Sequence, residues 1–386
     1  SCNNTMHEYV EIGSGREARK AYDLRDLSLV PARRTRSSKD VDTTWHIDAY
    51  TFDLPLCSHP TDALASPEFV IEMGKQGGLG ILNAEGLLGR HASFADSVAK
   101  VVGAASTDWH EMETMLQSQS RGTAVLQELH QAKLDMDLFA EHMARVRDSG
   151  ATVAVRVSPQ NARELAPHLI KAGAEILFIQ GTIISAEHVQ QGGEPLNLKE
   201  FIGSLDVPVI AGGVFDYSTA MHLMRSGAAG VIVGSGQSNQ NMALDVPLAT
   251  AIADVAAARR DYLDETGGRY VHVLADADVR TSGQIAVALA LGADAVMVGE
   301  PLARAAEASG EGMYWESVLG HPRFPRGEMR RVVAAEERQP LEIVLHGPSH
   351  DPYGTMNLVG GLRRIMAKCG YTDTKSFQKV NLTVRN

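Results

Sequence analysis

Short apolar runs, each closed by small or polar residues, recur along the 386-residue chain and alternate with amphipathic helical patterns. Runs of this length that are rich in β-branched residues are typical of parallel strands buried on both faces. Eight strand–helix units predict an α/β fold, a (β/α)8 TIM barrel; a doubly wound open sheet is the alternative, because apolar runs do not reveal closure. The runs are LPLCSH (54–59), GLGILN (78–83), TVAVRV (152–157), EILFIQ (175–180), VPVIAG (207–212), AGVIVG (229–234), RYVHVLA (269–275) and DAVMVG (294–299).

A repeated phrase supports equivalent units within a closed array. SGAAGVIVG (226–234) and LGADAVMVG (291–299) each read as a helix ending in glycine, followed by a strand ending in glycine. The carboxyl ends of all strands in such a barrel meet at one mouth, where barrel enzymes place their chemistry. We therefore expect one mouth to hold the residues that close the strands. These are Ser58, Gln180, Gly212, Gly234, Asp276 and Gly299.

Two segments exceed a minimal barrel. Residues 90–150, between the second and third strands, contain three helical patterns, which is enough for connecting helices but not for another domain. Residues 300–386 continue past the eighth strand as a flap-like and C-terminal extension. We expect a single domain over residues 1–386, with both segments as additions to the barrel.

The turn after the seventh strand carries negative charge at a position where such turns often bind phosphate. Asp276, Ala277 and Asp278 stand between the strand and a helix for which Thr281 is the predicted N-cap. Turns of this kind bind phosphate with backbone N–H groups, and glycines allow close approach. This turn instead carries two carboxylates and no glycine.

Composition narrows the class of protein. The net charge of −11, with one short basic run at 32–40, argues against nucleic acid as a partner. No stretch approaches the apolar length of a membrane span, and the start of the chain lacks a signal-peptide layout. Cys2, Cys57 and Cys369 lie far apart in the sequence and fit neither a metal site nor a disulfide framework. We expect a cytoplasmic protein that binds neither nucleic acid nor a membrane.

Several long motifs occur in the same order as in one known enzyme family. LPLCSHPTDALASPEFVIEMGKQGGLGILN, VPVIAGGVFDYSTAMHLMRSGAAGVIVGSG and TSGQIAVALALGADAVMVG resemble the IMP dehydrogenase/GMP reductase family. RVSPQNA and GPSHDPYGTMNLVGGLRR are similar to its short bacterial paralogue subfamily. Typical IMP dehydrogenases insert two CBS domains after the second strand, and the 90–150 segment is too short for them.

The resemblance implies a function. It implies a purine nucleoside monophosphate over the barrel mouth, NAD or NADP as hydride carrier, a K+ ion at the loop after the sixth strand, and a homotetramer. Oxidation of IMP and reductive deamination of GMP are equally compatible with it. The alternative is a catalytically silent barrel that binds a ligand or a regulatory partner.

The resemblance also implies site residues. Asp276 takes the place of the ribose-binding aspartate. Relatives then carry two glycines, and Gly-Ser after the eighth strand, where this chain has Ala277, Asp278 and Glu300. Two carboxylates thus face the expected phosphate, and Arg280 is placed to offset one charge. The expected nucleotide-binding residues are Ser58, Gly212, Gly213, Asp276, Ala277, Asp278, Gly299 and Glu300, and the expected cofactor-binding residues are Gln180 and Gly181.

The loop after the sixth strand lacks the family's nucleophile. It keeps Gly234 and Gly236 but contains no cysteine, and the catalytic residue is therefore unknown. The stretch from Gly236 to Leu244 is shorter than in relatives: either the loop is truly short, or part of it is absent from this sequence. His59 and Asp62, at the end of the first strand, are candidates for catalysis, and a satisfied core histidine is the alternative for His59.

Overall fold

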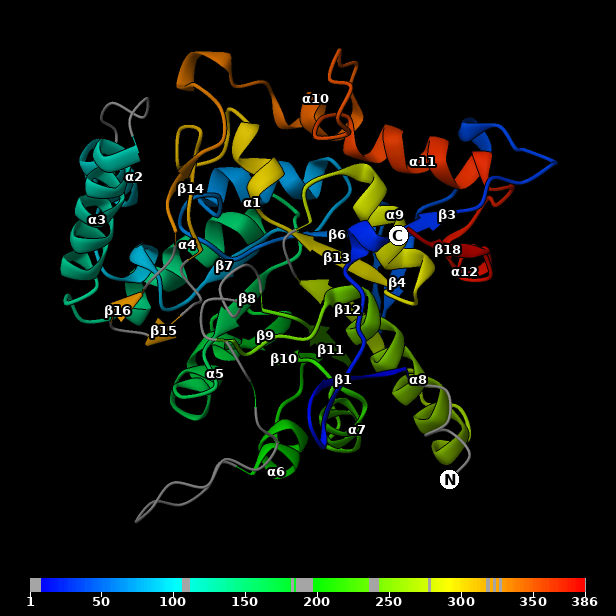
Figure 1. Ribbon diagram of the computed structural model, residues 1–386. Helices are drawn as coiled ribbons and strands as arrows, with labels where there is room; N and C mark the ends of the chain where they lie inside the picture. Colours follow the sequence, from blue (N-terminus) through cyan, green and yellow to red (C-terminus); the bar gives the residue numbers. More distant parts are fainter. Residues whose placement is uncertain are drawn as a thin grey trace.

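The structure is a computed structural model of the full chain (Figure 1). Its description covers residues 8–105, 112–181, 184, 197–235, 243–276, 279–316, 320–321, 324–325 and 328–385.

Eight parallel strands form the central sheet, and each lies within or overlaps one of the predicted runs. The sheet closes between its first two strands: the Leu79 N–H donates to the Leu56 carbonyl (3.0 Å), and the Ser58 N–H donates to the Leu79 carbonyl (2.9 Å). This closure confirms the barrel over the open sheet. The strands are β6 (Leu56–Ser58), β7 (Ile81–Asn83), β8 (Ala154–Val157), β9 (Ile176–Gln180), β10 (Val209–Val214), β11 (Gly230–Val233), β12 (His272–Asp276) and β13 (Ala295–Val298).

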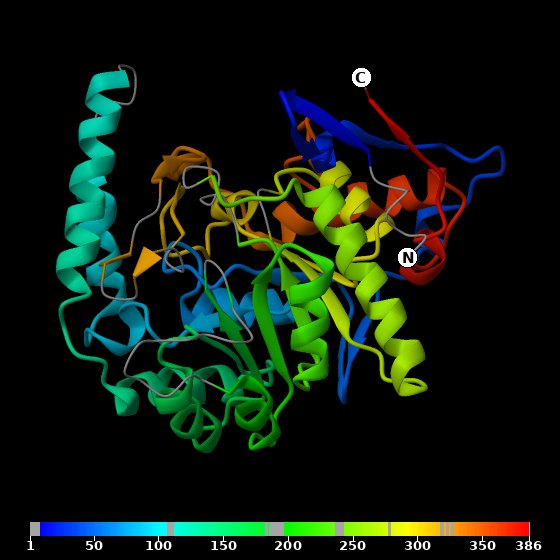
Figure 2. The same cartoon turned by 60° about the horizontal axis from the view of Figure 1, so that its bottom comes forward.

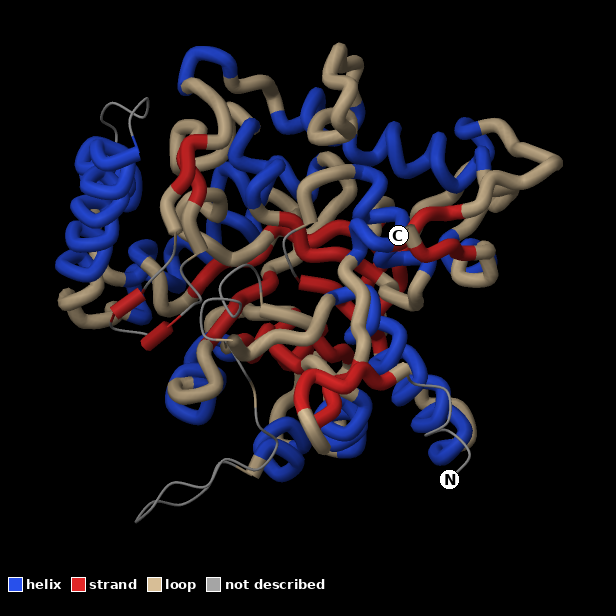
Figure 3. The backbone as a smooth tube through the Cα atoms, viewed as in Figure 1, coloured by secondary structure: helices blue, strands red, loops and turns tan. Residues whose placement is uncertain are grey.

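Helices surround the strands, as the tube in Figure 3 shows. Thr281 caps the helix after β12 as predicted, because its side chain accepts from the Gln284 N–H while the Gln284 side chain accepts from the Thr281 N–H. The helices that follow strands are α1 (Pro67–Lys75), α5 (Ala162–Lys171), α6 (Leu198–Gly203), α7 (Tyr217–Arg225), α8 (Leu248–Thr266), α9 (Ser282–Ala290) and the 3-10 helix η6 (Glu300–Arg304).

The helical patterns between β7 and β8 are confirmed. After the 3-10 turn η4 (Leu87–Gly89), the chain forms α2 (Phe94–Ala105), α3 (Met112–Leu129) and α4 (Met136–Asp148). Helices α2 and α3 pack together beside the barrel (Figures 1 and 2), and α4 packs against α1.

The N-terminal and C-terminal segments lie on the side of the barrel away from α2 and α3 (Figure 2). Strand β18 pairs antiparallel with β3, which ties the C-terminal segment to the N-terminal one. The N-terminal elements are β1 (Tyr9–Gly13), β2 (Arg16–Arg19), η2 (Leu24–Asp26), β3 (Leu27–Leu29) and η3 (Ser38–Asp40). The elements after η6 are β14 (Met313–Tyr314), β15 (Gly320–His321), β16 (Phe324–Pro325), β17 (Arg330–Arg331), η7 (Ala335–Glu337), α10 (Leu341–His346), α11 (Leu358–Lys368), α12 (Thr374–Phe377) and β18 (Leu382–Val384).

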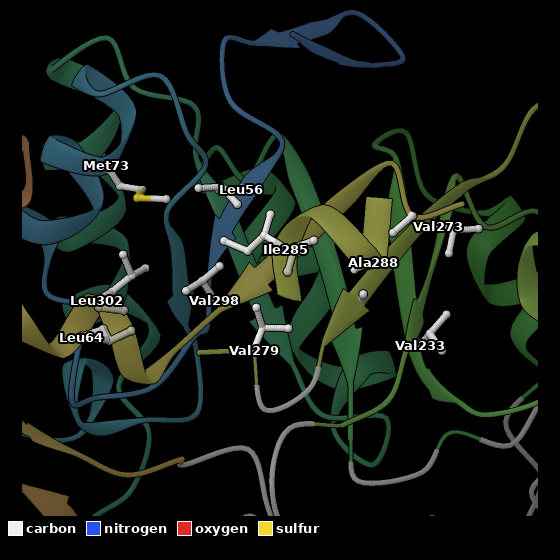
Figure 4. Packing of buried hydrophobic residues seen from close by; sticks show 14 of the residues in the cluster. Leu56, Leu64, Met73, Val233, Val273, Val279, Ile285, Ala288, Val298 and Leu302 are labelled. Atoms are coloured by element: carbon white, nitrogen blue, oxygen red, sulfur yellow. The ribbon is translucent and has the colours of Figure 1, made fainter. Parts of the chain in front are cut away.

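Two hydrophobic clusters hold the fold. The larger lies between strands and helices, and Figure 4 shows Leu56 and Val298 of neighbouring strands beside Ile285 of α9. The smaller fills the barrel lumen. A hairpin of β4 (Trp45–Ile47) and β5 (Tyr50–Phe52) closes the lumen at the amino ends of the strands. Within the described ranges, no helix combines the length and apolar character needed to cross a bilayer.

Candidate functional site

The lumen changes from apolar to polar near the carboxyl ends of four strands. Residues two positions apart in a strand face the same side, and in each of these strands an apolar lumen residue is followed two positions later by a polar one. The polar residues are between 0% and 4% exposed. A polar layer therefore lies over the apolar lumen. The pairs are Ile81 and Asn83, Ala154 and Arg156, Phe178 and Gln180, and Leu274 and Asp276.

Asp276 is the centre of this layer. It was predicted in the turn after the strand, but it is the last residue of β12, because it still pairs with Met297 of β13. The Gln180 side-chain amide donates to Asp276 Oδ2, and His59 Nε2 lies 3.3 Å from the same oxygen. Two other predicted site residues thus converge on this carboxylate.

The surroundings of His59 favour its protonated, charged form. Burial opposes its protonation, but the carboxylates of Asp276 and Glu316 outweigh this effect and raise the pKa of His59. Neither ring nitrogen has a hydrogen bond of good geometry among the described residues, so Nε2 contacts Asp276 as an ion pair. The imidazole is therefore a buried group that can hold a proton and still accept a further partner.

Several buried polar atoms at this mouth have no hydrogen-bond partner among the described residues. A buried polar atom without a partner is costly, so such atoms mark places that a ligand or ordered water can satisfy. They are Ser58 Oγ, His59 Nδ1, Gln180 Oε1 and Trp315 Nε1.

Arg156 anchors the β9 side of the mouth and was missed in the sequence. Its guanidinium donates twice to the Gln180 carbonyl (Nε 3.0 Å, Nη2 2.6 Å) and once to Asn83 Oδ1 (3.2 Å). Glu85 Oε2 lies 3.9 Å from Nη1. Burial lowers the pKa of Arg156, and Glu85 opposes that effect. A single charge near the end of an otherwise apolar strand was the signal that could have identified it.

Asp62 and Thr61 hold the loop after β6. Asp62 accepts a hydrogen bond from the Leu87 N–H (3.1 Å), and Thr61 donates to the Trp315 carbonyl. Burial raises the pKa of Asp62 to about 6, although the Leu87 N–H and nearby arginines oppose the shift. These contacts attach the loop to η4 and to the segment after β14.

The predicted glycines let backbones approach closely. A Cβ at Gly212 would lie 2.4 Å from that of Ile232, one at Gly213 would lie 2.4 Å from the Gly234 carbonyl oxygen, and one at Gly234 would lie 2.4 Å from the Asp276 carbonyl oxygen. Gly234 also has a φ of +85°. These contacts give the three glycines a structural reason that needs no ligand. The Gly181 N–H donates to the Gly212 carbonyl (3.0 Å); Gly236 lies outside the described residues.

Glu300 is neutralised by two arginines rather than one. Its Oε2 lies 3.3 Å from Arg280 Nε and 3.5 Å from Arg330 Nη1. The neighbouring Gly299 packs under Tyr314, since a Cβ there would lie 2.0 Å from the tyrosine hydroxyl oxygen. The predicted pair of facing carboxylates is therefore described for Glu300 alone, because Ala277 and Asp278 lie outside the described residues.

The end of β14 and the two residues after it cover the mouth. Tyr314, Trp315 and Glu316 are between 0% and 5% exposed, with Tyr314 against Gly299 and Trp315 bonded to Thr61. Burial raises the pKa of Tyr314, and the nearby Glu316 carboxylate, 3.4 Å from the hydroxyl, adds to this effect. The polar layer is thus closed from above by aromatic side chains.

Comparison with known proteins identifies the family. The sequence profile described as IMP dehydrogenase / GMP reductase domain matches residues 21–321. This chain belongs to the IMP dehydrogenase/GMP reductase family. It is similar to a crystal structure of an IMP dehydrogenase/GMP reductase-like protein from Corynebacterium glutamicum, with a TM-score of 0.90, 62% identity and 98% of each chain covered.

Its sequence relatives within the family differ in how much is known of them. An uncharacterized oxidoreductase of Mycolicibacterium smegmatis is 59% identical over 97% of this chain and 99% of its own length. An inosine-5'-monophosphate dehydrogenase of Haemophilus influenzae is 29% identical over 58% of this chain and 49% of its own length.

The described cysteines do not supply the nucleophile of the family's chemistry. Cys57 lies inside the lumen at 0% exposure, and burial together with the Asp276 carboxylate raises its pKa. Cys369 follows α11, away from the mouth, and burial raises its pKa as well. A thiol whose pKa is raised is a poor nucleophile, because the thiolate is the reactive form.

Proposed function

We propose that this protein is an NAD(P)-linked oxidoreductase of a purine nucleoside monophosphate, acting at purine C2 of IMP, XMP or GMP at the barrel mouth. The observation that carries the proposal is the position of Asp276: a buried carboxylate at the carboxyl end of β12, oriented by Gln180 and His59. A carboxylate can accept hydrogen bonds from both hydroxyls of a ribose. Membership of the family supports this role.

The residues at the mouth fit a nicotinamide cofactor at Gln180. Its Oε1 is buried and has no hydrogen-bond partner among the described residues, whereas its Nε2 is already used by Asp276. A buried acceptor of this kind suits the amide N–H of a carboxamide. The nicotinamide, when bound, carries the hydride. Arg156 would hold the backbone of Gln180 in place through its two hydrogen bonds to the carbonyl.

His59 is the group that would handle the proton in this reaction. Asp276 favours its protonated form, and Nδ1 has no hydrogen bond to any described residue. In the oxidation of IMP, the imidazole would accept at Nδ1 the proton of the water that adds to purine C2, while the hydride passes to NAD(P) and Asp276 stabilises the imidazolium. This role differs from that of the family's cysteine, because it forms no covalent adduct.

A K+ ion at the loop after β11 is also part of the resemblance, but most of that loop, residues 236–242, lies outside the described residues. We therefore route no step through K+.

The second candidate is a catalytically silent protein that binds the nucleotide. The sequence between residues 234 and 246 contains no cysteine. Ser58, His59, Gln180 and Asp276 are also no more than 1% exposed beneath the segment of Tyr314. A mouth without the nucleophilic thiol suits binding better than turnover.

Thermal stability and NAD(P)H absorbance, measured together with IMP, GMP and XMP, separate the two candidates. A nucleotide at 100 times its Kd should stabilise the fold by about 2.7 kcal/mol. Asp276→Asn should weaken nucleotide binding about ten- to hundredfold, because hydrogen bonds to a charged group are worth about 1.5–3 kcal/mol. The matched control is Asp148→Asn, at an exposed position at the end of α4.

The outcomes are distinct. Stabilisation with NAD(P)H turnover, both lost in Asp276→Asn, supports the enzyme. Stabilisation without turnover supports the silent candidate. If none of the three nucleotides stabilises the protein, or if both variants behave alike, Asp276 is not a nucleotide-binding residue and the proposal is wrong.

A further inference from the structure

Three charged side chains meet at one edge of the mouth, beside the loops after β12 and β13. Arg280 lies just before α9, and Glu300 is the first residue of η6. Arg330 reaches the same place from β17. In (β/α)8 barrels, the loops after the seventh and eighth strands frequently bind phosphate. The three side chains therefore stand where a barrel of this kind would hold an anion.

The geometry places one oxygen between two cations. Oε2 of Glu300 contacts both Arg280 Nε (3.3 Å) and Arg330 Nη1 (3.5 Å). Two guanidinium groups on one oxygen form the arrangement that arginines offer to a phosphate oxygen. The Arg280 side chain is 43% exposed and that of Glu300 16% exposed, so an ion from solvent can reach the pair.

Two backbone donors at the start of α9 are already in use. The Ser282 N–H donates to the Gly354 carbonyl (2.9 Å), and the Gln284 N–H donates to Thr281 Oγ1 (3.2 Å). The helix start is thus occupied by its own cap and by the loop before α11. The two arginines are therefore the charged donors that this edge offers to an anion.

We propose that the Glu300 carboxylate occupies the position of a ligand phosphate between Arg280 and Arg330, and we call it the resident anion. By occupying this position, Glu300 sets the preference between phosphorylated and unphosphorylated ligands. A phosphate that enters must displace the carboxylate, whereas a nucleoside need not. This extends the proposed function, since it concerns the phosphate of the nucleotide proposed for the same mouth. Glu300 is then a specificity-determining residue that weakens nucleotide binding relative to nucleoside binding.

Inorganic phosphate is the direct probe, because it needs no purine site. Calorimetric titration should show that Glu300→Gln binds phosphate about ten- to hundredfold more tightly than the natural protein, because a like charge about 4 Å away is removed. Adding Arg330→Gln to this variant should abolish the gain. The matched control is Glu328→Gln: Glu328 also lies near Arg330 (4.0 Å), but its side chain is 60% exposed. It should leave phosphate affinity unchanged.

Glu300→Ser provides a second variant if Glu300→Gln does not fold, and thermal unfolding checks both. The proposal is overturned if a folded Glu300 variant binds phosphate no more tightly than the natural protein. It is also overturned if Glu328→Gln tightens binding equally, or if the gain survives Arg330→Gln.

A pair of purine ligands separates this proposal from the proposed function. In Glu300→Gln, IMP should gain affinity about tenfold relative to inosine. If neither purine binds any variant while phosphate still responds to Glu300→Gln, the resident anion stands and the purine function fails. If both purines bind but their ratio does not change in Glu300→Gln, the resident anion is wrong and the purine function stands.

Discussion

The buried position of Asp62 disfavours the charged form of its carboxyl group. Its side chain is 1% exposed, and burial raises its pKa to about 6. The folded state therefore holds the proton more tightly than the unfolded chain, whose carboxyl has a pKa of about 3.9. The free energy of unfolding should fall as pH rises from about 4 to about 6, by up to about 3 kcal/mol, and should stay lower above that range.

Asp62→Asn should remove this pH dependence. The amide oxygen can still accept from the Leu87 N–H, so the variant should gain up to about 3 kcal/mol at about pH 7.5 and little at about pH 4. Urea unfolding at the two pH values measures the difference. Asp148→Asn, at an exposed position, is the control and should change little at either pH. A variant less stable than the natural protein at about pH 7.5 would show that the folded state uses the carboxylate.

At the scale of single residues, the sequence indicated which side chains lie at the mouth but not their partners. Asp276, Gln180 and His59 were each predicted there from their positions at strand ends. The convergence of Gln180 and His59 on one oxygen of Asp276 depends on the stagger of strands that are far apart in the sequence, and no local pattern encodes it. Arg156 was missed because strand periodicity marks its position as lumen-facing, which ordinarily implies an apolar residue.

At the scale of elements, the barrel strands were predictable and the elements over its mouth were not. The strands are largely buried and mostly apolar, and such runs have a strong signal. Strands β14 and β17 have two residues each and cannot show any period. Their position over the mouth is set by contacts such as that between Tyr314 and Gly299. The closure of the mouth therefore became visible only in the structure.

The contact between Gly299, which follows β13, and Tyr314 of β14 can be tested by substitution. Gly299→Ala should destabilise the protein by about 1–3 kcal/mol, because the new methyl group would lie 2.0 Å from the buried Tyr314 hydroxyl and something must shift. Gly103→Ala in α2 is the matched control. Its Cβ would meet nothing within 4 Å, so it should stabilise by about 0.5–1 kcal/mol.

Chemical denaturation of both variants measures these changes. Tyr314→Phe in the Gly299→Ala background removes the clashing oxygen and should restore part of the loss. If Gly299→Ala is as stable as Gly103→Ala, Tyr314 does not pack on Gly299.

At the scale of the whole molecule, the lumen is sealed at both ends. Trp45 and Phe52 close the amino ends of the strands, and the polar layer around Asp276 closes the carboxyl ends beneath Tyr314. Cys57 lies between these seals. Its exposure to a reagent in solution therefore depends on opening the barrel itself, not on the movement of a surface loop.

Alkylation of Cys57 should accordingly follow global unfolding. In a Cys2→Ala/Cys369→Ala variant, iodoacetamide should modify Cys57 only at denaturant concentrations that unfold the protein by circular dichroism, because the thiol is 0% exposed and burial raises its pKa. Any NAD(P)-linked turnover should survive iodoacetamide under native conditions. A Cys2→Ala/Cys57→Ala variant is the control: Cys369, 7% exposed after α11, should be modified at lower denaturant. Modification of Cys57 well before unfolding, with loss of turnover, would mean that the lumen opens in the native protein and that a thiol takes part in the reaction.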